Sequence, residues 1–131
     1  MTRINIAIDG PAGAGKSTVA KAVAKDMNII YLDTGAMYRA VALKAIQSGF
    51  DTRDQVVLEA LVKDIDIRIE HDGNEQRIFL DGKDVSGDIR TAEVSIGASN
   101  VAVNPAVRIK LVELQRKIAK DNDVVMDGRD I

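Results

Sequence analysis

A glycine-rich stretch near the start of the chain carries residue types that suit phosphate binding. It reads Gly10-Pro11-Ala12-Gly13-Ala14-Gly15-Lys16-Ser17 and matches the pattern G-x-x-x-x-G-K-[ST]. Glycines let the backbone wrap around phosphate oxygens, so that successive N–H groups point at negative charge. Lys16 would then reach the β- and γ-phosphates, and the Ser17 hydroxyl would bind Mg²⁺. The stretch predicts a nucleoside triphosphate site, and its alternative is a glycine-rich turn without a ligand.

The segments on either side are of the kinds that such a loop requires. Residues 3–8, RINIAI, form a short β-branched run that predicts a strand, and residues 18–25 have high helix propensity. A second apolar run at 29–32, closed by Asp33-Thr34-Gly35, completes a βαβ unit. This pattern predicts a doubly wound α/β fold with its ligands at the carboxyl ends of parallel strands, where residues 33–35 and the glycine-rich stretch both fall.

A helix is predicted over residues 36–47, with Gly49 as its stop signal. Tyr38 and Arg39 lie on this helix, close to the expected phosphate site. By burial statistics alone, such a pair is more often a half-buried tyrosine and a solvated arginine. Four apolar residues are expected to face the core, namely Met37, Ala40, Val41 and Leu43.

The hydrophobic period changes from about 3.6 to about 2 after a short helix that Asp54 is expected to cap. Isoleucines then alternate with charged residues, and Asp72-Gly73 and Asp81-Gly82 predict two turns. Residues 65–86 therefore predict an antiparallel meander. It is too short to be stable alone, so we interpret it as an insert that covers the substrate side of the α/β core.

Two further helices and a third core strand are expected in the last part of the chain. Asp88 is a candidate cap for one helix, and Asn104 with Pro105 predicts the start of the next. Val124-Val125-Met126 predicts a strand, and Asp127 at its carboxyl end could hold Mg²⁺ through water. The core would then consist of residues 1–64 and 87–131.

The composition narrows the class of protein. The 131 residues include 18 basic and 20 acidic side chains, so nucleic-acid binding has no electrostatic support. The absence of cysteine excludes disulfides and thiolate metal sites. His71, the single histidine, is expected to be an exposed residue of the first turn in the meander rather than a catalytic or metal-binding residue. No leader pattern or apolar run of about 18 residues is present, so we expect a cytoplasmic enzyme without membrane partners.

Several stretches together resemble the N-terminal part of a bacterial cytidylate (CMP/dCMP) kinase. They are IAIDGPAGAGKST at 6–18, LDTGAMYRA at 32–40, P-x-V-R at 105–108 and VVMDGRDI at 124–131. The first is shared by many NTPases, but the order of the other three is specific. An antiparallel sheet inserted in the nucleoside-monophosphate region is also a feature of the family, and the meander would supply it.

The resemblance implies a P-loop, nucleoside-monophosphate-kinase-like parallel sheet and phosphoryl transfer from ATP to CMP or dCMP, with Mg²⁺ as cofactor. It implies that nine residues hold the ATP phosphates, namely Gly10, Pro11, Ala12, Gly13, Ala14, Gly15, Lys16, Ser17 and Thr18. Lys16, Arg39 and Arg129 would act on the transferred group. CMP would be bound by Thr34, Gly35, Tyr38, Arg39, Ser99, Arg108, Arg129 and Asp130. Within that set, Ser99, Arg108 and Asp130 would read the edge of the cytosine.

Two alternatives stay open beside this reaction. One is a P-loop kinase for another small acceptor, such as a different nucleoside monophosphate, although Arg108 and Asp130 as readers of the base argue against it. The other is a non-catalytic nucleotide-binding fragment. Family members continue beyond Ile131 into further core strands and an arginine-bearing lid, and the full-length family is expected to be monomeric.

The first prediction concerns those further strands and the lid. In the family's strand order, the strand at residues 4–8 lies between the third strand and a strand beyond Ile131. We therefore expect the 131-residue chain to show little kinase activity, a lower unfolding midpoint than an extended chain, and self-association through that strand. An arginine of the lid type can be worth ~10³ to 10⁵ in rate. CMP-dependent ATP consumption, thermal midpoint and sedimentation should be measured for both lengths. A short chain that is monomeric, fully active and equally stable would contradict this expectation.

Overall fold

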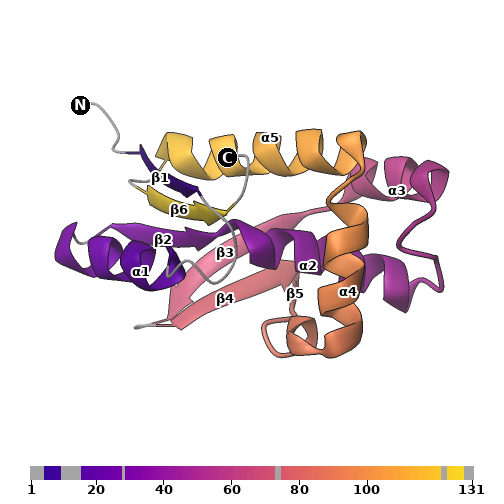
Figure 1. Cartoon of the computed structure of the whole chain (residues 1–131), viewed down its shortest axis with the longest axis horizontal. Helices are drawn as coiled ribbons and strands as arrows, with labels where there is room; N and C mark the ends of the chain where they lie inside the picture. Colours follow the sequence, from indigo (N-terminus) through magenta and orange to yellow (C-terminus); the bar gives the residue numbers. More distant parts are fainter. Residues whose placement is uncertain (1–4, 10–15, 28, 73–74, 122–123, 129–131) are drawn as a thin grey trace. The chain divides into compact units, whose positions relative to one another are not determined.

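The computed structural model describes residues 5–9, 16–27, 29–72, 75–121 and 124–128 of an α/β chain. Contacts divide the chain into two compact units. The first unit comprises residues 1–35 and 114–131, and the second comprises residues 36–113. None of the helices in the described part of the chain is long and apolar enough to cross a membrane. In chain order (Figure 1), the elements are β1 (Asn5–Asp9), α1 (Lys16–Met27), β2 (Ile30–Asp33), α2 (Thr34–Gln47), α3 (Gln55–Leu61), η1 (Val62–Asp64), β3 (Ile67–Asp72), β4 (Glu75–Leu80), β5 (Lys83–Asp84), η2 (Asp88–Arg90), α4 (Ala92–Val101), α5 (Pro105–Asp121) and β6 (Val124–Gly128).

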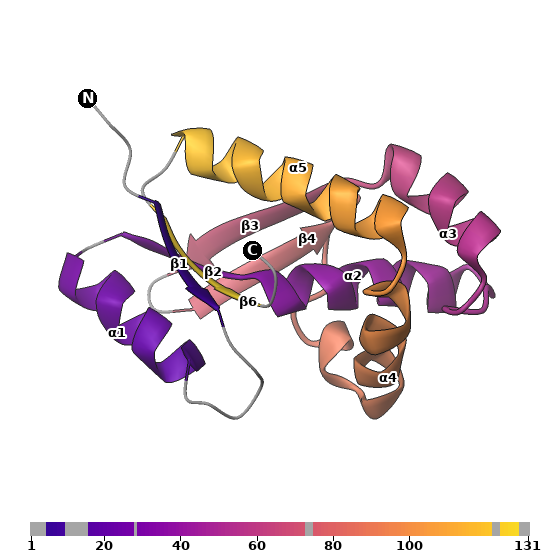
Figure 2. The same cartoon turned by 45° about the horizontal axis from the view of Figure 1, so that its top comes forward.

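The first unit contains a three-stranded parallel sheet in the order β1-β6-β2. The central strand β6 holds both neighbours in one register, because Val125 is the partner of Ile6 on β1 and of Tyr31 on β2. Helix α1 lies along one face of this sheet (Figure 2). Its buried alanines Ala20 and Ala24 pack with apolar residues of the two outer strands and their flanks. The predicted unit of strand, helix and parallel strand is confirmed, with β6 inserted between its two strands.

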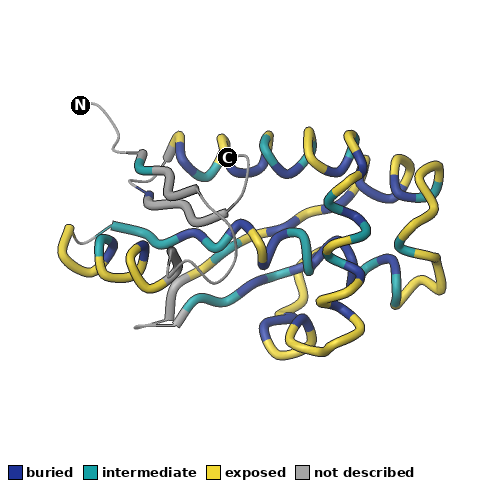
Figure 3. Tube along the Cα trace, viewed as in Figure 1, coloured by how far each residue is buried: buried dark blue, intermediate teal, exposed yellow. Residues whose placement is uncertain are grey.

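Helix α2 supplies much of the core of the second unit. The four residues expected to face the core are all buried, as the continuous buried stretches along the helix show (Figure 3). The helix begins at Thr34, two positions earlier than the sequence pattern predicts. It ends at Gln47, as predicted, and Gly49 follows with a φ of +78°, the left-handed conformation that glycine adopts without strain.

The second unit also contains the predicted antiparallel sheet, in the order β3-β4-β5. Asp81 and Gly82 form the turn between β4 and β5, with φ values of +50° and +86°. Two central residues with positive φ define the tight hairpin turn whose twist matches that of the strands it joins. Ile67, Ile78 and Leu80 are buried, which accounts for the alternating pattern of the sequence.

Two sequence expectations are wrong at the level of single residues. Asp88 does not cap α4 but begins the short helix η2, and α4 is capped by Thr91, whose Oγ1 accepts a hydrogen bond from Val94 N at 3.2 Å. Asp and Thr are both capping residue types. Thr91 is the cap because it has an extended conformation immediately before the apolar run. His71 lies in strand β3 and pairs with Gln76, because the hairpin ladder continues further toward its turn than the sequence pattern indicates.

The predicted start of α5 is confirmed. Pro105 is the first residue of the helix, and Asn104 Oδ1 accepts a hydrogen bond from Val107 N at 3.2 Å. Buried residues recur along α5 every three or four positions (Figure 3), as at Val107 and Leu111. The spacing of the apolar residues therefore determines which face of α5 is buried.

Asp81 joins three elements of the second unit. Its Oδ2 accepts a hydrogen bond from Lys44 Nζ of α2 at 2.7 Å, and its Oδ1 accepts one from the backbone N–H of Asp66 at 2.9 Å. Its own N–H donates to Asp66 O at 2.8 Å. Burial raises the pKa of Asp81, but the hydrogen bonds from Lys44 and Asp66 outweigh that effect, so the pKa lies below its ordinary value of 3.8. The ionised carboxylate is therefore the form that this junction stabilises.

The second prediction tests the charge of Asp81. Asparagine tolerates a positive φ, so Asp81→Asn keeps the turn while it removes the ion pair with Lys44. Because the folded pKa is depressed, the stabilisation is complete above 3.8 and is lost as the pH falls through the lower folded value. We expect the free energy of unfolding to fall by about 0.2 to 1 kcal/mol at pH 7, as for other partly exposed pairs.

Urea unfolding at several pH values measures this difference between variant and parent. The difference should shrink toward zero below pH 3.8. The matched control is Asp66→Asn, which removes the same charge beside the exposed and longer pair with Arg68, 3.7 Å, and keeps the backbone hydrogen bonds. A deficit for Asp81→Asn that is equally large at all pH values would show that the charge does not stabilise the junction.

Candidate functional site

The carboxyl ends of the three parallel strands meet at one edge of the first unit's sheet. Asp33, the last residue of β2, is the register partner of Asp127 on β6. Asp127 is in turn the partner of Ile8 on β1, one residue before that strand ends at Asp9. The pairing thus places acidic residues of neighbouring strands at the edge where α/β sheets bind their ligands.

Helix α1 begins with two of the predicted phosphate-binding residues. Lys16 and Ser17 are its first two residues, and Thr18, the third, is exposed. The N-terminus of a helix carries partial positive charge and unpaired N–H groups, which favour an anion. Residues 10–15, the rest of the predicted phosphate-binding loop, lie outside the described part of the chain. Their role stays a prediction.

The first turn of α2 follows β2 directly and carries two more predicted site residues. Thr34 is buried, with 1% of its surface exposed, and Gly35 is exposed. A Cβ atom at position 35 would lie only 3.2 Å from Asp33 Oδ1. The carboxylate of the strand end therefore lies close against the backbone of this turn, and glycine provides the space for it.

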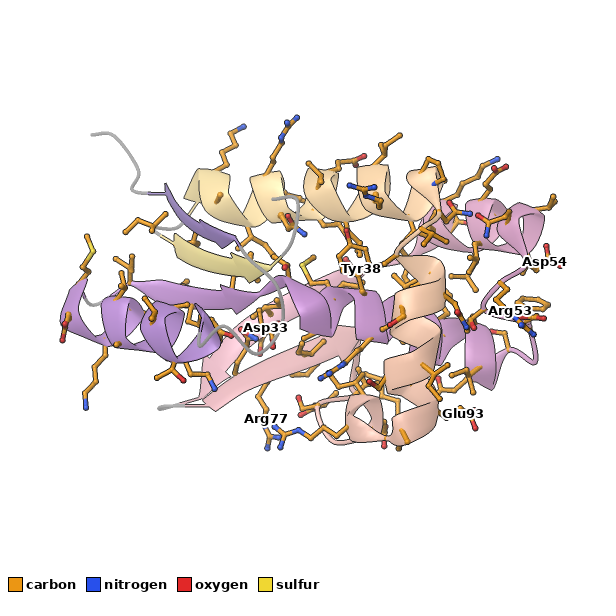
Figure 4. All side chains as sticks on the ribbon, viewed as in Figure 1. Asp33, Tyr38, Arg53, Asp54, Arg77 and Glu93 are labelled. Atoms are coloured by element: carbon orange, nitrogen blue, oxygen red, sulfur yellow. The ribbon has the colours of Figure 1, made fainter. Side chains whose placement is uncertain are left out.

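The other predicted acceptor residues that the structure describes belong to the second unit. Tyr38, labelled in Figure 4, and Arg39 are half-buried on α2. Ser99 is exposed on α4, and Arg108 is exposed in the first turns of α5. One compact unit thus holds residues predicted for the phosphate and residues predicted for the base. Arg129 and Asp130 lie outside the described residues.

Three carboxyl groups with perturbed pKa values lie elsewhere in the second unit. The pKa of Asp84 is lowered by hydrogen bonds from the hydroxyl and the N–H of Ser86, and that of Asp51 by the backbone N–H of Arg53, labelled in Figure 4. The third is Asp81. None of these carboxyls is a predicted site residue, so the shifts belong to turns that hold the fold together.

The described residues contain no group of three or more histidine, aspartate or glutamate residues arranged to hold a metal ion. The sequence reasoning named Asp127 but gave Asp33 no role of its own, although the two are register partners. The signal for Asp33 is an acidic residue that ends a short apolar run, the same signal that marks Asp127.

The comparisons with known proteins all point to one family. The family model for cytidylate kinase matches residues 6–131. A cytidylate kinase of Pelotomaculum thermopropionicum is 57% identical over 129 residues, which cover 97% of this chain and 57% of the relative. A cytidylate kinase of Pediococcus pentosaceus is 54% identical over 129 residues, which cover 98% of this chain and 57% of the relative. One of Caldicellulosiruptor bescii is 48% identical over 131 residues, which cover 100% of this chain and 58% of the relative. The chain therefore spans somewhat more than half the length of these curated relatives.

Proposed function

Because this chain belongs to the cytidylate kinase family, we propose that it forms the N-terminal part of a kinase that transfers the γ-phosphoryl group of ATP to CMP or dCMP. The single observation that carries the proposal is the family match over residues 6–131. It favours this reaction over a kinase for another acceptor and over a non-catalytic nucleotide-binding fragment. A cytoplasmic location and a monomeric full-length protein belong to the same proposal.

The donor side lies in the first unit. Residues 10–18 hold the phosphates of ATP in a P-loop, with Lys16 as the cation that neutralises them. The support for this is the position of Lys16 and Ser17 at the N-terminus of α1, which follows the edge strand β1. The Ser17 hydroxyl and, through water, the Asp127 carboxylate would hold Mg²⁺, a hard cation that prefers such oxygen ligands. The ion would supply positive charge beside the β- and γ-phosphates.

The acceptor side is built mainly from α2, α4 and α5. Thr34, Gly35, Tyr38, Arg39 and Arg129 surround the phosphate of CMP. A guanidinium group clamps phosphate oxygens through two parallel hydrogen bonds.

The edge of the base is read by three other residues, Ser99, Arg108 and Asp130. A carboxylate accepts from the exocyclic amine of cytosine, while an arginine donates to its carbonyl. Reading both groups together distinguishes cytosine from uracil. The antiparallel sheet at 65–86 is an insert in this region of a P-loop, nucleoside-monophosphate-kinase-like fold with its core in residues 1–64 and 87–131.

The proposed reaction requires the protein to align the two nucleotides and to neutralise the charge on the transferred phosphoryl group. A phosphate oxygen of CMP attacks the γ-phosphorus in line, so that a new P–O bond forms while the bond to the β-phosphate oxygen breaks and ADP leaves. Lys16, Arg39 and Arg129 neutralise the charge that spreads over the transferred group. No residue of the chain forms a covalent bond to phosphorus, so alignment of the two nucleotides contributes a large part of the rate.

Calorimetric titration of the chain with CMP, UMP and AMP tests the proposed acceptor. CMP should bind with the highest affinity. Equal affinities for all three would overturn the assignment of a cytidine nucleotide. Binding of CMP without any phosphoryl transfer in an extended chain would favour the non-catalytic alternative.

The third prediction concerns the donor site. Lys16→Ala should abolish turnover and weaken ATP binding far more than CMP binding, because it removes a cation from the phosphates of ATP alone. Removing a charged partner of this kind typically costs about 2 to 5 kcal/mol. Steady-state rates in an extended chain, with calorimetry of both nucleotides, measure the effect. A near-normal rate in the variant would contradict the P-loop assignment.

The fourth prediction concerns the base. Arg108→Met and Asp130→Ala should reduce discrimination between CMP and UMP more than they change ATP affinity. Good bidentate contacts to a base carry about 1 to 3 kcal/mol of discrimination. The measurement is the ratio of dissociation constants for CMP and UMP. If both variants kept the ratio of the parent, the role in base reading would be wrong.

A further inference from the structure

Helix α4 meets α2 and the loop after it at one closely packed position. A Cβ atom at Gly97 would lie 3.0 Å from Ala42 Cβ, 3.1 Å from Thr52 Cγ2 and 3.5 Å from Ile46 Cδ1. Contacts of 3.0 to 3.4 Å are shorter than side chains tolerate without a movement of a few tenths of an ångström. Here the nearest contact is a methyl group fixed to the backbone of α2, so a side chain at 97 must push the two helices apart.

Two amides continue this contact along the same face of α4 and into the turn beyond it. Asn100 Nδ2 donates to Thr52 Oγ1 at 2.9 Å, so Thr52 contacts α4 with its methyl group at Gly97 and its hydroxyl one turn later. Asn104 Nδ2 donates to Gln55 at the start of α3, to Oε1 at 2.8 Å and to the backbone O at 3.3 Å. We call Gly97, Asn100 and Asn104 the α4 seam.

Asn104 does two separate tasks in the seam. With 1% of its surface exposed, it bridges to Gln55 through its amide N–H groups. It also caps α5, because its Oδ1 accepts from Val107 N and its backbone O accepts from Arg108 N at 3.1 Å. The first turn of α5, and with it the backbone of Arg108, is thereby tied to α3.

The seam lies in the second unit, which also holds four of the residues proposed to contact the acceptor nucleotide, namely Tyr38, Arg39, Ser99 and Arg108. Ser99 stands on α4 between Gly97 and Asn100, and Arg108 follows the cap of α5. Tyr38 and Arg39 stand on α2, the helix that Gly97 contacts. The seam therefore sets where the base-reading residues stand relative to the phosphate-binding helix.

We propose that Gly97 and Asn104 are positioning residues, which hold Ser99 and Arg108 at a fixed place relative to α2 and so set the preference of the acceptor site for CMP over UMP. The proposal rests on the proposed function. Hydrogen-bond readout of a base depends on sub-ångström placement, and a 1 Å misplacement in such a site can cost about 100-fold. The seam belongs to the second unit, whereas the residues proposed to bind ATP, 10–18, belong to the first, so the affinity for ATP serves as an internal reference.

The test compares two variants of the seam with matched controls by calorimetry of CMP, UMP and ATP. Gly97→Ala inserts one methyl group into the contact, and its control Gly87→Ala adds the same group where nothing lies within 4 Å and φ is −82°. Asn104→Asp keeps the cap oxygen but removes both donors to Gln55, and its control Asp54→Asn makes the reverse exchange of carboxylate for amide at the cap of α3. Both seam variants should lower the CMP-to-UMP preference by roughly 3- to 10-fold, a fraction of the effect of a full 1 Å displacement. Both controls should keep the preference and the ATP affinity of the parent.

A third variant separates geometry from simple loss of stability. The exchange Ala42→Gly with Gly97→Ala moves the methyl group from one helix to the other and relieves the 3.0 Å contact. It should restore most of the preference for CMP, although it places a glycine inside α2. If Gly97→Ala alone does not fold, Asn104→Asp and this exchange decide the question.

Each outcome bears on one proposal or on both. Folded seam variants that lower thermal stability but keep the parent's CMP-to-UMP preference would overturn the positioning role and leave the proposed function standing. A parent chain that binds ATP but shows no preference for CMP would overturn the proposed acceptor, and this inference with it.

Discussion

The candidate site depends on the pairing of β6 with both β1 and β2. Parallel strands end at the same edge of a sheet, and the common register carries Asp33, Asp127 and the end of β1 to that edge. The chain after β1 and after β2 enters a helix, so the N-termini of α1 and α2 follow the same edge. Helix N-termini carry partial positive charge, which favours anionic ligands beside such an edge.

Different kinds of interaction stabilise each of the two units internally. In the first, backbone ladders between parallel strands set positions, and the side chains of α1 fill one face. In the second, helices carry the candidate residues, and single side-chain contacts connect them to their neighbours: Lys44 with Asp81 joins α2 to the turn between β4 and β5, and Asn104 with Gln55 joins the start of α5 to α3. No buried side-chain nitrogen or oxygen in the described part lacks a hydrogen-bond partner, so these polar junctions are complete.

Local sequence signals such as turn and cap residues predict much of this fold. They do not predict the contacts between residues that are far apart in the sequence. Gly49 and the Asp81-Gly82 turn need a positive φ that few residue types supply, and Asn104-Pro105 combines a cap with the first helical residue. The prediction of Asp88 as the cap failed because Thr91 is also a capping residue type, and only the local backbone distinguishes the two. The pair Lys44 and Asp81 is separated by 37 residues and the pair Gln55 and Asn104 by 49, and neither leaves a periodic trace in the sequence.

The candidate site can be predicted from the sequence only where it lies in short motifs. The order of LDTGAMYR, P-x-V-R and DGRD proposes candidate residues without any knowledge of their distances. The register of Asp33 with Asp127 and the close contact at Gly97, which leaves no room for a methyl group, depend on how separate elements pack, so only the structure reveals them.

The central place of β6 has a consequence for the order in which the chain can fold during synthesis. Among the described strands it is the last to leave the ribosome, and β1 and β2 pair only through it. Residues 36–113, which make up the second unit, are complete before β6 exists. Since domains generally fold as units while the chain is made, the helices of that unit can bury their core first. The parallel sheet therefore cannot form until β6 has been synthesised, and β1, the first described strand to be made, stays without this partner for the longest time.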